Sequence, residues 1–385
     1  MRIGILTGGG DVPGLNAVIK AFVAYATDAG HEVVGLRRGW EALVHVIPDR
    51  GADNSRWVVP LDPQNTRTID RSGGTVLHTT RLNPEIATAR QVPEHLRPYA
   101  GPADAWGRFD LTPHVLQNIA FLGLDVIVAI GGDGTLTFAR RLDAEGAPVI
   151  GIPKTMDNDV FGTDYCLGFS TAITRSVSYI NDLRTGAGSH ERMLVVELFG
   201  RYSGETCLLA SYLAGTDRAV IAEVPFDPAK LFDLMIADRS KNPSGYAILA
   251  ISEGAVPIDG GRFERGEPDV AGNRQLGGVG EYVTKYFEDR CEERVIYQRL
   301  AYLMRSGPPD SLDQLVAKNF GRLAADLASR GDAGHMVAIV DGRYAAVPIE
   351  LTGLQRKQVD VDRFYDKEAF RPKGTTLLGL PMFHS

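Results

Sequence analysis

An apolar run passes directly into a charged turn in the stretch APVIGIPKTMDND, residues 147–159. The run at 147–152 is typical of a buried strand, and a proline fixes the backbone where it ends. The turn then carries an ammonium group on Lys154 and carboxylates on Asp157 and Asp159. A hydrophobic core rarely accepts such charges, whereas a site for phosphate and metal requires them. We therefore interpret residues 147–159 as a strand that ends at a functional site.

Two other apolar runs end in glycine-rich loops. Residues 2–6 lead into TGGGD at 7–11, and residues 124–130 lead into GGDGT at 131–135. Consecutive glycines let backbone N–H groups approach a phosphate, and a helix that starts there adds a favourable dipole. Each loop alone is also compatible with a plain tight turn. Three strand ends with the same chemistry favour one phosphate site at the carboxyl edge of a sheet.

The carboxylates in these segments indicate phosphoryl transfer. Asp133 lies among glycines and suits Mg²⁺, which needs only one or two carboxylates beside phosphate oxygens; it also suits a helix cap. Asp157 and Asp159 alternate in an expected extended segment, so both point to the same side. Transfer to an alcohol needs a proton acceptor and neutralisation of charge, and Lys154 supplies a positive charge. An Asx-turn beside a solvated lysine would explain only one of the two aspartates.

The spacing of apolar runs predicts an α/β protein with mainly parallel sheets covered by helices on both faces. In the first half we expect strands at 2–6, 32–37, 75–78, 124–130 and 147–152, and helices at 13–28 and 135–145. In the second half we expect strands at 193–198, 219–222, 246–251 and 336–340, and helices at 171–185, 204–214, 229–238, 276–288 and 312–329. Residues 254–278 are polar and glycine-rich, which predicts a surface excursion.

The length of 385 residues predicts two domains. We expect domains at 1–150 and 151–345, a ligand cleft between them, a chain that crosses between the two, and a tail at 346–385. The net charge of −7 gives no reason to expect binding to nucleic acid or an anionic membrane. The three cysteines are far apart, which fits a reducing compartment, and the histidines show no zinc-binding spacing. With neither a leader nor a membrane span in the sequence, we expect a cytoplasmic protein.

Three arginines stand at the ends of predicted strands. Arg81 follows a glycine-led strand, and Arg192 and Arg201 flank the strand at 193–198. A guanidinium group suits bidentate recognition of phosphate, although an arginine is more often a solvated surface residue. These three residues are therefore candidates for phosphate binding.

Four segments, in their order and spacing, resemble the phosphofructokinase family. They are TGGGD with PGLN at 13–16, GGDGT at 131–135, PKTMDND at 153–159, and SHER at 189–192 through FGR at 199–201. The resemblance covers about residues 1–345. It implies two Rossmann-like three-layer α/β/α domains, with the phosphoryl donor and Mg²⁺ in the first and the sugar phosphate in the second. It also implies transfer of a phosphoryl group from ATP or pyrophosphate to the 1-hydroxyl of fructose 6-phosphate.

The resemblance assigns roles by position. Asp157 matches the general base, and the other positions expected to assist transfer are Lys154, Thr155 and Arg201. The positions that match the donor site are Gly9, Arg81, Gly132, Asp133, Gly134 and Thr135, with Asp133 as the Mg²⁺ ligand. The positions that match the sugar-phosphate site are Thr155, Asp157, Asp159, Phe199, Gly200, Arg201 and Glu253. Arg192 matches a residue that reaches a neighbouring subunit's site, which implies a homodimer or homotetramer.

The last substrate segment departs from the pattern of bacterial ATP-dependent members. Where that pattern has a histidine and then an arginine, this chain has Tyr302 and Arg305, as in many pyrophosphate-dependent members. Tyr302 still offers a hydrogen-bond donor, and Arg305 still offers a guanidinium for the 6-phosphate. A further arginine of the pattern has no ungapped match. Arg294 is the first candidate for it, and Arg299 is the second.

The two positions that distinguish the donors disagree. Pyrophosphate-dependent members typically carry Asp at the position of Gly134 and Lys at that of Lys154, whereas most bacterial ATP-dependent members carry Gly at both. An Asp at 134 would repel the α-phosphate of ATP, whereas Gly134 leaves its space open. Phe138 stands where a small residue near the adenine is common, which argues against ATP. We expect ATP as donor, with pyrophosphate as the alternative.

Two other functions are more distant alternatives. A catalytically weak regulatory member would be expected to lack the base or the metal ligand, yet Asp133, Asp157 and Asp159 are all present. A lipid or NAD kinase would share only the GGDGT loop and would not explain Lys154 or Arg192. Residues after 352 lie outside the resemblance, and the sequence assigns them no role.

Overall fold

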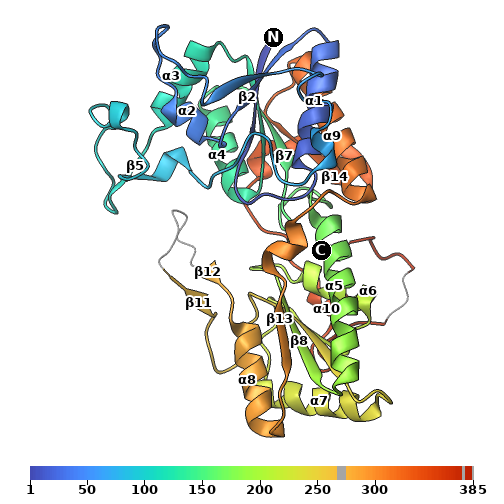
Figure 1. Cartoon of the computed structure of the whole chain (residues 1–385). Helices are drawn as coiled ribbons and strands as arrows, with labels where there is room; N and C mark the ends of the chain where they lie inside the picture. Colours follow the sequence, from blue (N-terminus) through green and yellow to red (C-terminus); the bar gives the residue numbers. More distant parts are fainter. Residues whose placement is uncertain (267–274, 375–377, 384–385) are drawn as a thin grey trace.

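Two α/β units make up the computed structural model, which describes residues 1–266, 275–374 and 378–383. The two units lie one above the other in Figure 1. The upper unit in that view is built on a seven-stranded sheet, and the lower unit on a four-stranded sheet. Helices cover both faces of each sheet, as the next paragraphs describe. The predicted fold class, two three-layer α/β units, is confirmed.

The larger sheet is mainly parallel, with antiparallel strands at both edges. Its order is β15 (Arg343–Pro348), β14 (His335–Val340), β7 (Val149–Pro153), β6 (Val126–Gly131), β1 (Arg2–Thr7), β2 (Glu32–Leu36) and β3 (Val58–Leu61). Because β1, β6 and β7 are parallel neighbours, their carboxyl ends meet at one edge. The loops at 7–11, 131–135 and 153–159 therefore begin side by side.

Alternation along the strands divides the apolar core of this unit into two layers. Ile3 and Ile5 of β1 face one layer, and Leu6 faces the other. The first layer is covered by α1 (Leu15–Asp28) and α9 (Ser311–Arg330). The second is covered by α2 (Glu41–His45), α3 (Thr112–Leu122) and α4 (Asp133–Ala144).

The smaller sheet is parallel throughout the part that the structure describes. Its order is β13 (Ile296–Arg299), β8 (Met193–Leu198), β10 (Ala247–Ser252) and β9 (Arg218–Val220). One face packs on α5 (Phe169–Ser189) and α6 (Glu205–Ala214), and the other on α7 (Pro228–Lys241) and α8 (Val279–Cys291). A ribbon of β11 (Glu264–Arg265) and β12 (Gln275–Leu276) precedes α8.

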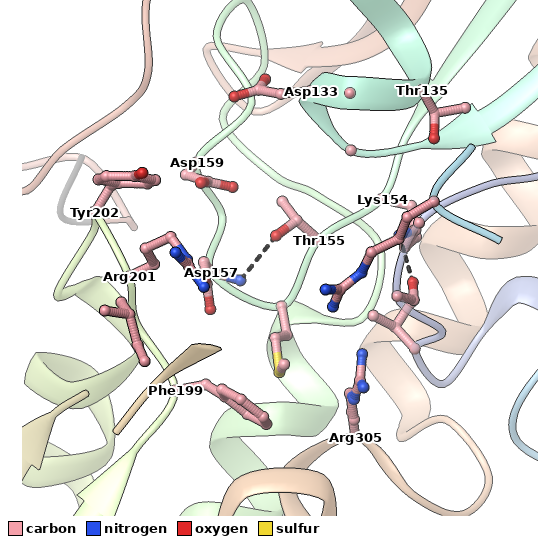
Figure 2. Close-up of a pocket in the computed structure, with 18 of the residues that line it drawn as sticks. Asp133, Thr135, Lys154, Thr155, Asp157, Asp159, Phe199, Arg201, Tyr202 and Arg305 are labelled. Atoms are coloured by element: carbon pink, nitrogen blue, oxygen red, sulfur yellow. Dashed lines mark hydrogen bonds between the residues drawn. The ribbon is translucent and has the colours of Figure 1, made fainter. Parts of the chain in front are cut away.

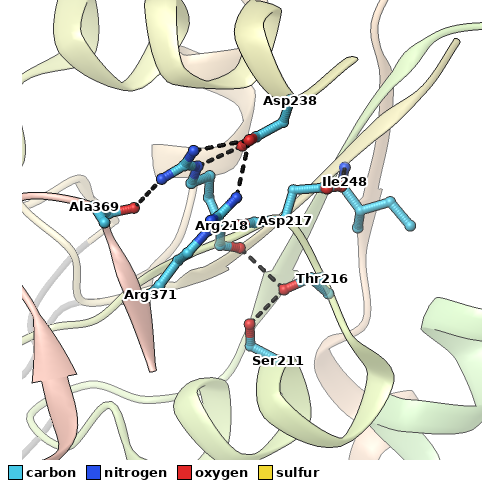
Figure 3. A network of polar contacts seen from close by, with 8 residues as sticks. All are labelled: Ser211, Thr216, Asp217, Arg218, Asp238, Ile248, Ala369 and Arg371. Atoms are coloured by element: carbon cyan, nitrogen blue, oxygen red, sulfur yellow. Dashed lines mark hydrogen bonds and ion pairs between the residues drawn. The ribbon is translucent and has the colours of Figure 1, made fainter. Parts of the chain in front are cut away.

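The C-terminal segment ends on this second unit. It forms α10 (Val361–Phe364), β16 (Tyr365–Asp366) and β17 (Arg371–Pro372), and it buries Phe364, Tyr365 and Phe370 in the core beside α7 and α8. A buried ion pair fixes it further, because Asp238 of α7 pairs with Arg218 at 2.5 Å and with Arg371 at 2.9 Å (Figure 3). The Arg218–Asp238 pair is buried, whereas Arg371 is 44% exposed, so water weakens the pair that the tail itself contributes. The tail is thus an integral part of the second unit.

Several predicted elements differ from those observed. The strand expected at 75–78 is wrong, because these residues form a turn and His78 has a left-handed φ of 56°. The helix expected from 276 begins only at Val279, since Gly277 and Gly278 have φ values of 129° and 108°. The expected surface excursion at 254–278 lies partly outside the described residues. The short strands β3 and β13 were missed, and so was the longer helix α3, although its buried residues Val115, Ile119 and Leu122 follow a helical spacing.

The strand predicted at 336–340 is present as β14, and it pairs with β7 of the larger sheet. The chain therefore returns to the first unit after it has built most of the second, and it then crosses again to place its C-terminal segment. The domain boundaries at 150 and 345 stay a prediction. In the residues that the structure describes, no helix is both long enough and apolar enough to cross a membrane.

Candidate active site

A cavity of about 800 Å³ lies where the loops of the larger sheet face the second unit (Figure 2). The first unit contributes the glycine loops and the turn after β7, and the second contributes the ends of β8, β10 and β13 and the short helix η4 (Ala301–Arg305). Predicted site residues that line it are Gly9, Arg81, Gly132, Asp133, Gly134, Thr135, Lys154, Thr155, Asp157, Asp159, Phe199, Arg201, Glu253, Tyr302 and Arg305. One cavity therefore gathers most of the predicted site.

The two glycine loops pack against each other at the amino end of α4. A Cβ on Gly8 would lie 2.4 Å from the Thr135 hydroxyl, so these segments approach too closely for a larger residue. Gly8 N donates to Ile130 O at 2.9 Å, which ties the first loop to β6. Helix α4 begins at Asp133, after Gly132, and its amino end lines the cavity. This arrangement suits a phosphate group, because backbone N–H groups and the helix dipole favour negative charge there.

Gly10 lets a distant arginine enter the site. A Cβ on Gly10 would lie 2.4 Å from Nη1 of Arg305. Arg305 belongs to η4, is 8% exposed, and donates from Nη1 to Asp11 O at 3.3 Å. Its guanidinium also lies over the rings of Tyr302 and Phe199, at 4.4 and 5.7 Å from their centroids. These contacts join the first loop to the second unit.

Lys154 is buried at the end of β7. Its Nζ donates to Gly10 O at 2.5 Å, and the residue is only 4% exposed. Burial, with the nearby Arg305 charge, lowers the pKa of Lys154 to about 8. The ammonium is therefore held in a position from which it can contact an anion bound at the glycine loops.

Asp157 and Asp159 both line the cavity, but not through an extended segment as expected. The chain turns at 156–157, and Asn158 has a left-handed φ of 54°. The buried Asn158 side chain holds this turn, because it donates to Glu205 at 3.0 Å and accepts from Cys166 N at 2.8 Å. The prediction that both carboxylates face the cavity is confirmed, and the predicted alternation is wrong.

Four carboxyl groups share the cavity, and burial is the largest cause of a raised pKa in each. The pKa of Asp133 is raised to about 6 and that of Glu253 to about 7. The pKa of Asp157 is raised well above its usual value, by burial and by the charges of Asp159 and Glu253. Burial also raises the pKa of Asp159, although a hydrogen bond from the Thr155 side chain lowers it in part. A bound cation would stabilise the charged forms of these carboxyl groups and would lower their pKa values.

The carboxylates fit Mg²⁺ held jointly with a phosphorylated ligand. Oδ1 of Asp133 and Oδ1 of Asp157 are buried, and neither has a hydrogen-bond partner among the described residues. Among the residues that the structure describes, no group of three or more His, Cys, Asp or Glu side chains lies close enough together to hold a metal ion by itself. Mg²⁺ usually takes one or two carboxylates and completes its shell with water and phosphate oxygens. Asp133 therefore suits a shared site and not a closed protein cage.

Cationic side chains complete the walls. In Figure 2 the labelled Asp133, Asp157 and Asp159 lie toward one side of the view, and Lys154 and Arg305 toward the other. Arg299 also lines the cavity and pairs with Glu197 at 3.0 Å and with Glu253 at 3.2 Å. The three labelled aspartates thus lie apart from Lys154 and Arg305, while Arg299 lies beside Glu253.

Arg299, and not the first candidate Arg294, is the arginine that reaches the cavity. The carboxyl end of β13 faces the cavity and carries Arg299, whereas Arg294 precedes the amino end of β13 and is exposed. Gly200 lies between the lining residues Phe199 and Arg201, and its φ of 141° makes the bend between them.

Arg192 lies outside the cavity of its own chain. It precedes β8, whereas Phe199 follows the other end of that strand, so roughly 20 Å of extended chain separate the two residues. Its placement is compatible with the predicted role at a neighbouring subunit's site, which stays a prediction.

Phe138 does not face the cavity. Its side chain is fully buried, with its ring 5.1 Å from that of Trp40 in an edge-on contact, in the core between α4 and the larger sheet. The helix turns this side chain away from the site, so it is not among the described lining residues.

Sequence reasoning missed Arg356 and Tyr202. Arg356, in the tail, donates from Nε to Oδ2 of Asp133 at 3.0 Å, and its guanidinium lies 4.0 Å from the ring centroid of Tyr202. Tyr202 directly follows the FGR segment, which was a usable signal. Arg356 had only the neighbouring Lys357 to mark it, because no strand end or glycine loop precedes it.

Comparisons with known proteins agree with this site. A family model described as phosphofructokinase matches residues 2–328. An ATP-dependent 6-phosphofructokinase 3 of Streptomyces coelicolor is 36% identical over 341 residues, 88% of this chain and 91% of the relative. A pyrophosphate–fructose 6-phosphate 1-phosphotransferase of Amycolatopsis methanolica is 35% identical over 372 residues, 96% of this chain and 99% of the relative.

Solved structures show the same fold. The pyrophosphate-dependent phosphofructokinase of Nitrosospira multiformis aligns with a TM-score of 0.73 and 16% identity, over 97% of this chain and 89% of that one. The phosphofructokinase of Saccharomyces cerevisiae aligns with a TM-score of 0.69 and 23% identity, over 91% of this chain and 45% of that one.

Proposed function

The chain belongs to the phosphofructokinase family, and we propose that it transfers the terminal phosphoryl group of ATP to the 1-hydroxyl of fructose 6-phosphate. One observation carries this proposal. Oδ1 of Asp133 and Oδ1 of Asp157 have no hydrogen-bond partner among the described residues, and both aspartates line the same cavity as the two glycine loops and the amino end of α4. The products are fructose 1,6-bisphosphate and ADP.

Asp157 is the proposed general base. The hydroxyl oxygen forms a bond to the γ-phosphorus as the bond from that phosphorus to the β-bridging oxygen breaks, and the hydroxyl proton passes to Asp157. The raised pKa of Asp157, caused by burial, makes this carboxylate a better proton acceptor. The positive charge of Arg201 opposes this rise in the pKa of Asp157. Arg201 thereby favours the ionised form of Asp157, which accepts the proton.

Positive groups around the glycine loops are proposed to bind the moving phosphoryl group. Lys154 is fixed by its bond to Gly10 O and supplies a charge at the loop. Arg81 and Thr135 line the same end of the cavity. Asp133 and the phosphates of the donor would hold Mg²⁺, which when bound neutralises charge on the phosphates.

The second unit is the proposed sugar-phosphate side. Glu253 accepts hydrogen bonds from sugar hydroxyls, Arg299 and Arg305 bind the 6-phosphate, and Tyr302 donates a further hydrogen bond. Phe199 forms an apolar wall. Arg192 would complete the site of a neighbouring subunit, so we also propose a homodimer or homotetramer.

ATP is the proposed donor for two reasons. A Cβ on Gly134 would meet no described atom within 4 Å, so space is open where an aspartate would repel the α-phosphate. Phe138 points into the core, which removes the argument that its ring closes the base pocket. Pyrophosphate remains the alternative donor, because Lys154 is present and one relative carries a pyrophosphate-dependent name.

The test is formation of fructose 1,6-bisphosphate from fructose 6-phosphate and Mg²⁺, with ATP or pyrophosphate as donor. We expect turnover with ATP and little with pyrophosphate. Turnover with pyrophosphate alone would reverse the donor assignment. Turnover with neither would favour the regulatory, non-catalytic reading.

A further inference from the structure

The C-terminal segment crosses the candidate active site between two firm anchors. At its start, Thr352 O accepts from Arg140 of α4 at 2.7 Å, and a Cβ on Gly353 would lie 2.6 Å from the Thr137 hydroxyl, also on α4. At its end, the side chains of Phe364, Tyr365 and Phe370 are buried in the core of the second unit. Residues 352–371, which we call the strap, therefore connect the helix at the glycine loop to the second unit.

The middle of the strap lies against the acidic side of the cavity. Lys357 N donates to Asp159 O at 3.1 Å, and Gln358 donates from Nε2 to Tyr202 O at 3.1 Å. The backbone of Arg356 forms an isolated β-bridge with Val160, which directly follows the turn at 156–159. These contacts on both sides of Arg356 place its backbone at the edge of the site, and its side chain reaches inward to Asp133.

The Arg356 guanidinium has two partners. Its Nε lies 3.0 Å from Oδ2 of Asp133, and it stacks 4.0 Å from the centre of the Tyr202 ring. The side chain is 42% exposed, so water screens the ion pair and the pair contributes little that would prevent rearrangement. The head group can therefore move while Tyr202 still supports it.

A metal ion and Arg356 compete for the same carboxylate. Oδ2 of Asp133 already accepts from Arg356, and two positive charges on one carboxylate repel each other. The phosphates of a donor bound at the amino end of α4 would offer Arg356 new acceptors, and a guanidinium matches phosphate geometry well. If Arg356 leaves Asp133 and contacts a donor phosphate, its positive charge has a negative partner both in the empty site and in the donor-bound site.

We propose that Arg356 is a donor-binding residue that neutralises Asp133 in the empty site and contacts a donor phosphate when Mg²⁺ occupies Asp133. The inference rests on the proposed phosphoryl transfer for the identity of the ligand. It extends the donor site to a segment beyond residue 328, where the match to the family model ends.

Binding measurements on the full chain test this role. Calorimetry with Mg²⁺ and the non-hydrolysable ATP analogue AMP-PNP gives the donor Kd for the wild type, for Arg356→Ala and for Arg356→Gln, and a separate titration gives the Kd for fructose 6-phosphate. Loss of a charged hydrogen bond to phosphate should raise the donor Kd by about 10- to 100-fold. The Kd for fructose 6-phosphate should not change, because the described side-chain partners of Arg356 are Asp133 and Tyr202 and not the proposed 6-phosphate residues Arg299 and Arg305.

A second readout separates binding from a merely structural role. Without nucleotide, titration of Mn²⁺ followed by electron paramagnetic resonance should show tighter metal binding in Arg356→Ala, because Asp133 has lost its competing cation. Damage to the strap would instead weaken both ligands and would not tighten metal binding. Arg363→Ala is the matched control, since Arg363 is exposed on the strap and donates to Gly379 O away from the cavity. It should behave as the wild type.

The outcomes are distinguishable. An unchanged donor Kd in Arg356→Ala, in a wild type that turns over ATP, overturns the role of Arg356 and leaves the proposed function intact. A wild type that binds Mg²⁺ and AMP-PNP without turnover overturns the function, while the variants still test Arg356. If Arg356→Ala does not fold, Arg356→Gln, which keeps a polar side chain without the charge, must show the same two shifts: weaker donor binding and tighter metal binding. A wild type that binds neither AMP-PNP nor pyrophosphate contradicts both proposals.

Discussion

Asp157 combines burial with an oxygen that no described residue contacts by a hydrogen bond. A buried acceptor without a partner is costly to folding, and such atoms are concentrated where a ligand supplies the missing contact. Asp133 has the same property at Oδ1. These two atoms, and not the number of charges in the cavity, are the observations that best support the proposed metal ligand Asp133 and the proposed base Asp157.

Replacement of Asp157 by Asn should lower kcat by about 10²–10⁴, because the amide cannot accept the hydroxyl proton. The KM for fructose 6-phosphate should change little, since the shape of the site is kept. Steady-state kinetics with fructose 6-phosphate and ATP measure both constants. Asp182→Asn, at an exposed position of α5, is the control and should be neutral. A near-normal kcat in Asp157→Asn would remove Asp157 as the base.

Replacement of Gly134 by Asp should raise the KM for ATP by at least about tenfold, because a carboxylate beside the phosphates adds like-charge repulsion. Open space around Gly134 predicts that the variant folds normally. Kinetics with ATP and with pyrophosphate check the selectivity, and Gly134→Ala supplies a control of nearly equal backbone geometry without charge. An equal loss in Gly134→Ala would show that bulk, and not charge, controls donor entry.

At the scale of elements, two kinds of segment build the site. Parallel strands bring the glycine loops together at one edge, and the turn at 156–159 is then shaped by the buried Asn158 side chain. A left-handed φ at a residue other than glycine costs free energy, which the hydrogen bonds of Asn158 offset. The buried Asn158 side chain thus holds the turn, together with the Thr206 hydroxyl, which donates to Met156 O at 2.8 Å.

Three histidines lie together where α2, η3 (Glu94–Leu96) and α3 meet. His45 stacks on Trp57, and the rings of His95 and His114 are 6.0 Å apart. Burial, then His95 and the Arg38 and Arg56 charges, lower the pKa of His45 to about 4. Glu41, which would raise it, lies at 3.8 Å and is too distant for a strong hydrogen bond. Burial also lowers the pKa values of His95 and His114.

These shifts predict loss of stability in acid. Since the folded-state pKa of His45 lies below its unfolded value of 6.5, the unfolded chain binds the proton first as the pH falls. The stabilisation is present above pH 6.5 and is lost progressively toward about pH 4. Thermal unfolding across this range should show a smaller fall of Tm in His45→Gln than in the wild type. His190→Gln, at an exposed position, is the control, and parallel profiles for His45→Gln and the wild type would contradict the prediction.

For the molecule as a whole, the proposed role of Arg192 means that each site would be complete only when a neighbouring subunit supplies this residue. Arg192→Ala should therefore raise the KM for fructose 6-phosphate, whereas Asp157→Asn removes the base of its own site. In a dimer with reciprocal sites, a hybrid of the two variants contains one intact site. Unfolding and refolding an equal mixture should restore about a quarter of the wild-type activity, because half of the dimers are hybrids with one of two sites intact.

Activity of refolded mixtures, measured beside each variant alone, checks this expectation, and sedimentation checks the subunit number. The matched control is a mixture of Asp157→Asn with the strap variant Arg363→Ala. That mixture should show only the activity expected from its intact Arg363→Ala sites. No gain for the Arg192→Ala mixture would place Arg192 outside the neighbour's site.

The parallel sheets, the three loops at one edge and most of the lining residues could be predicted from the sequence, because strand periodicity, glycine conformation and the ends of parallel strands depend on local backbone geometry. Three features came from the packing of the folded chain: Phe138 faces the core, Arg299 and not Arg294 reaches the cavity, and β14 returns to the first sheet. This packing also brought Arg356 to Asp133, 223 positions away in the chain. Such contacts depend on how remote segments pack, and no local pattern of residues encodes that packing.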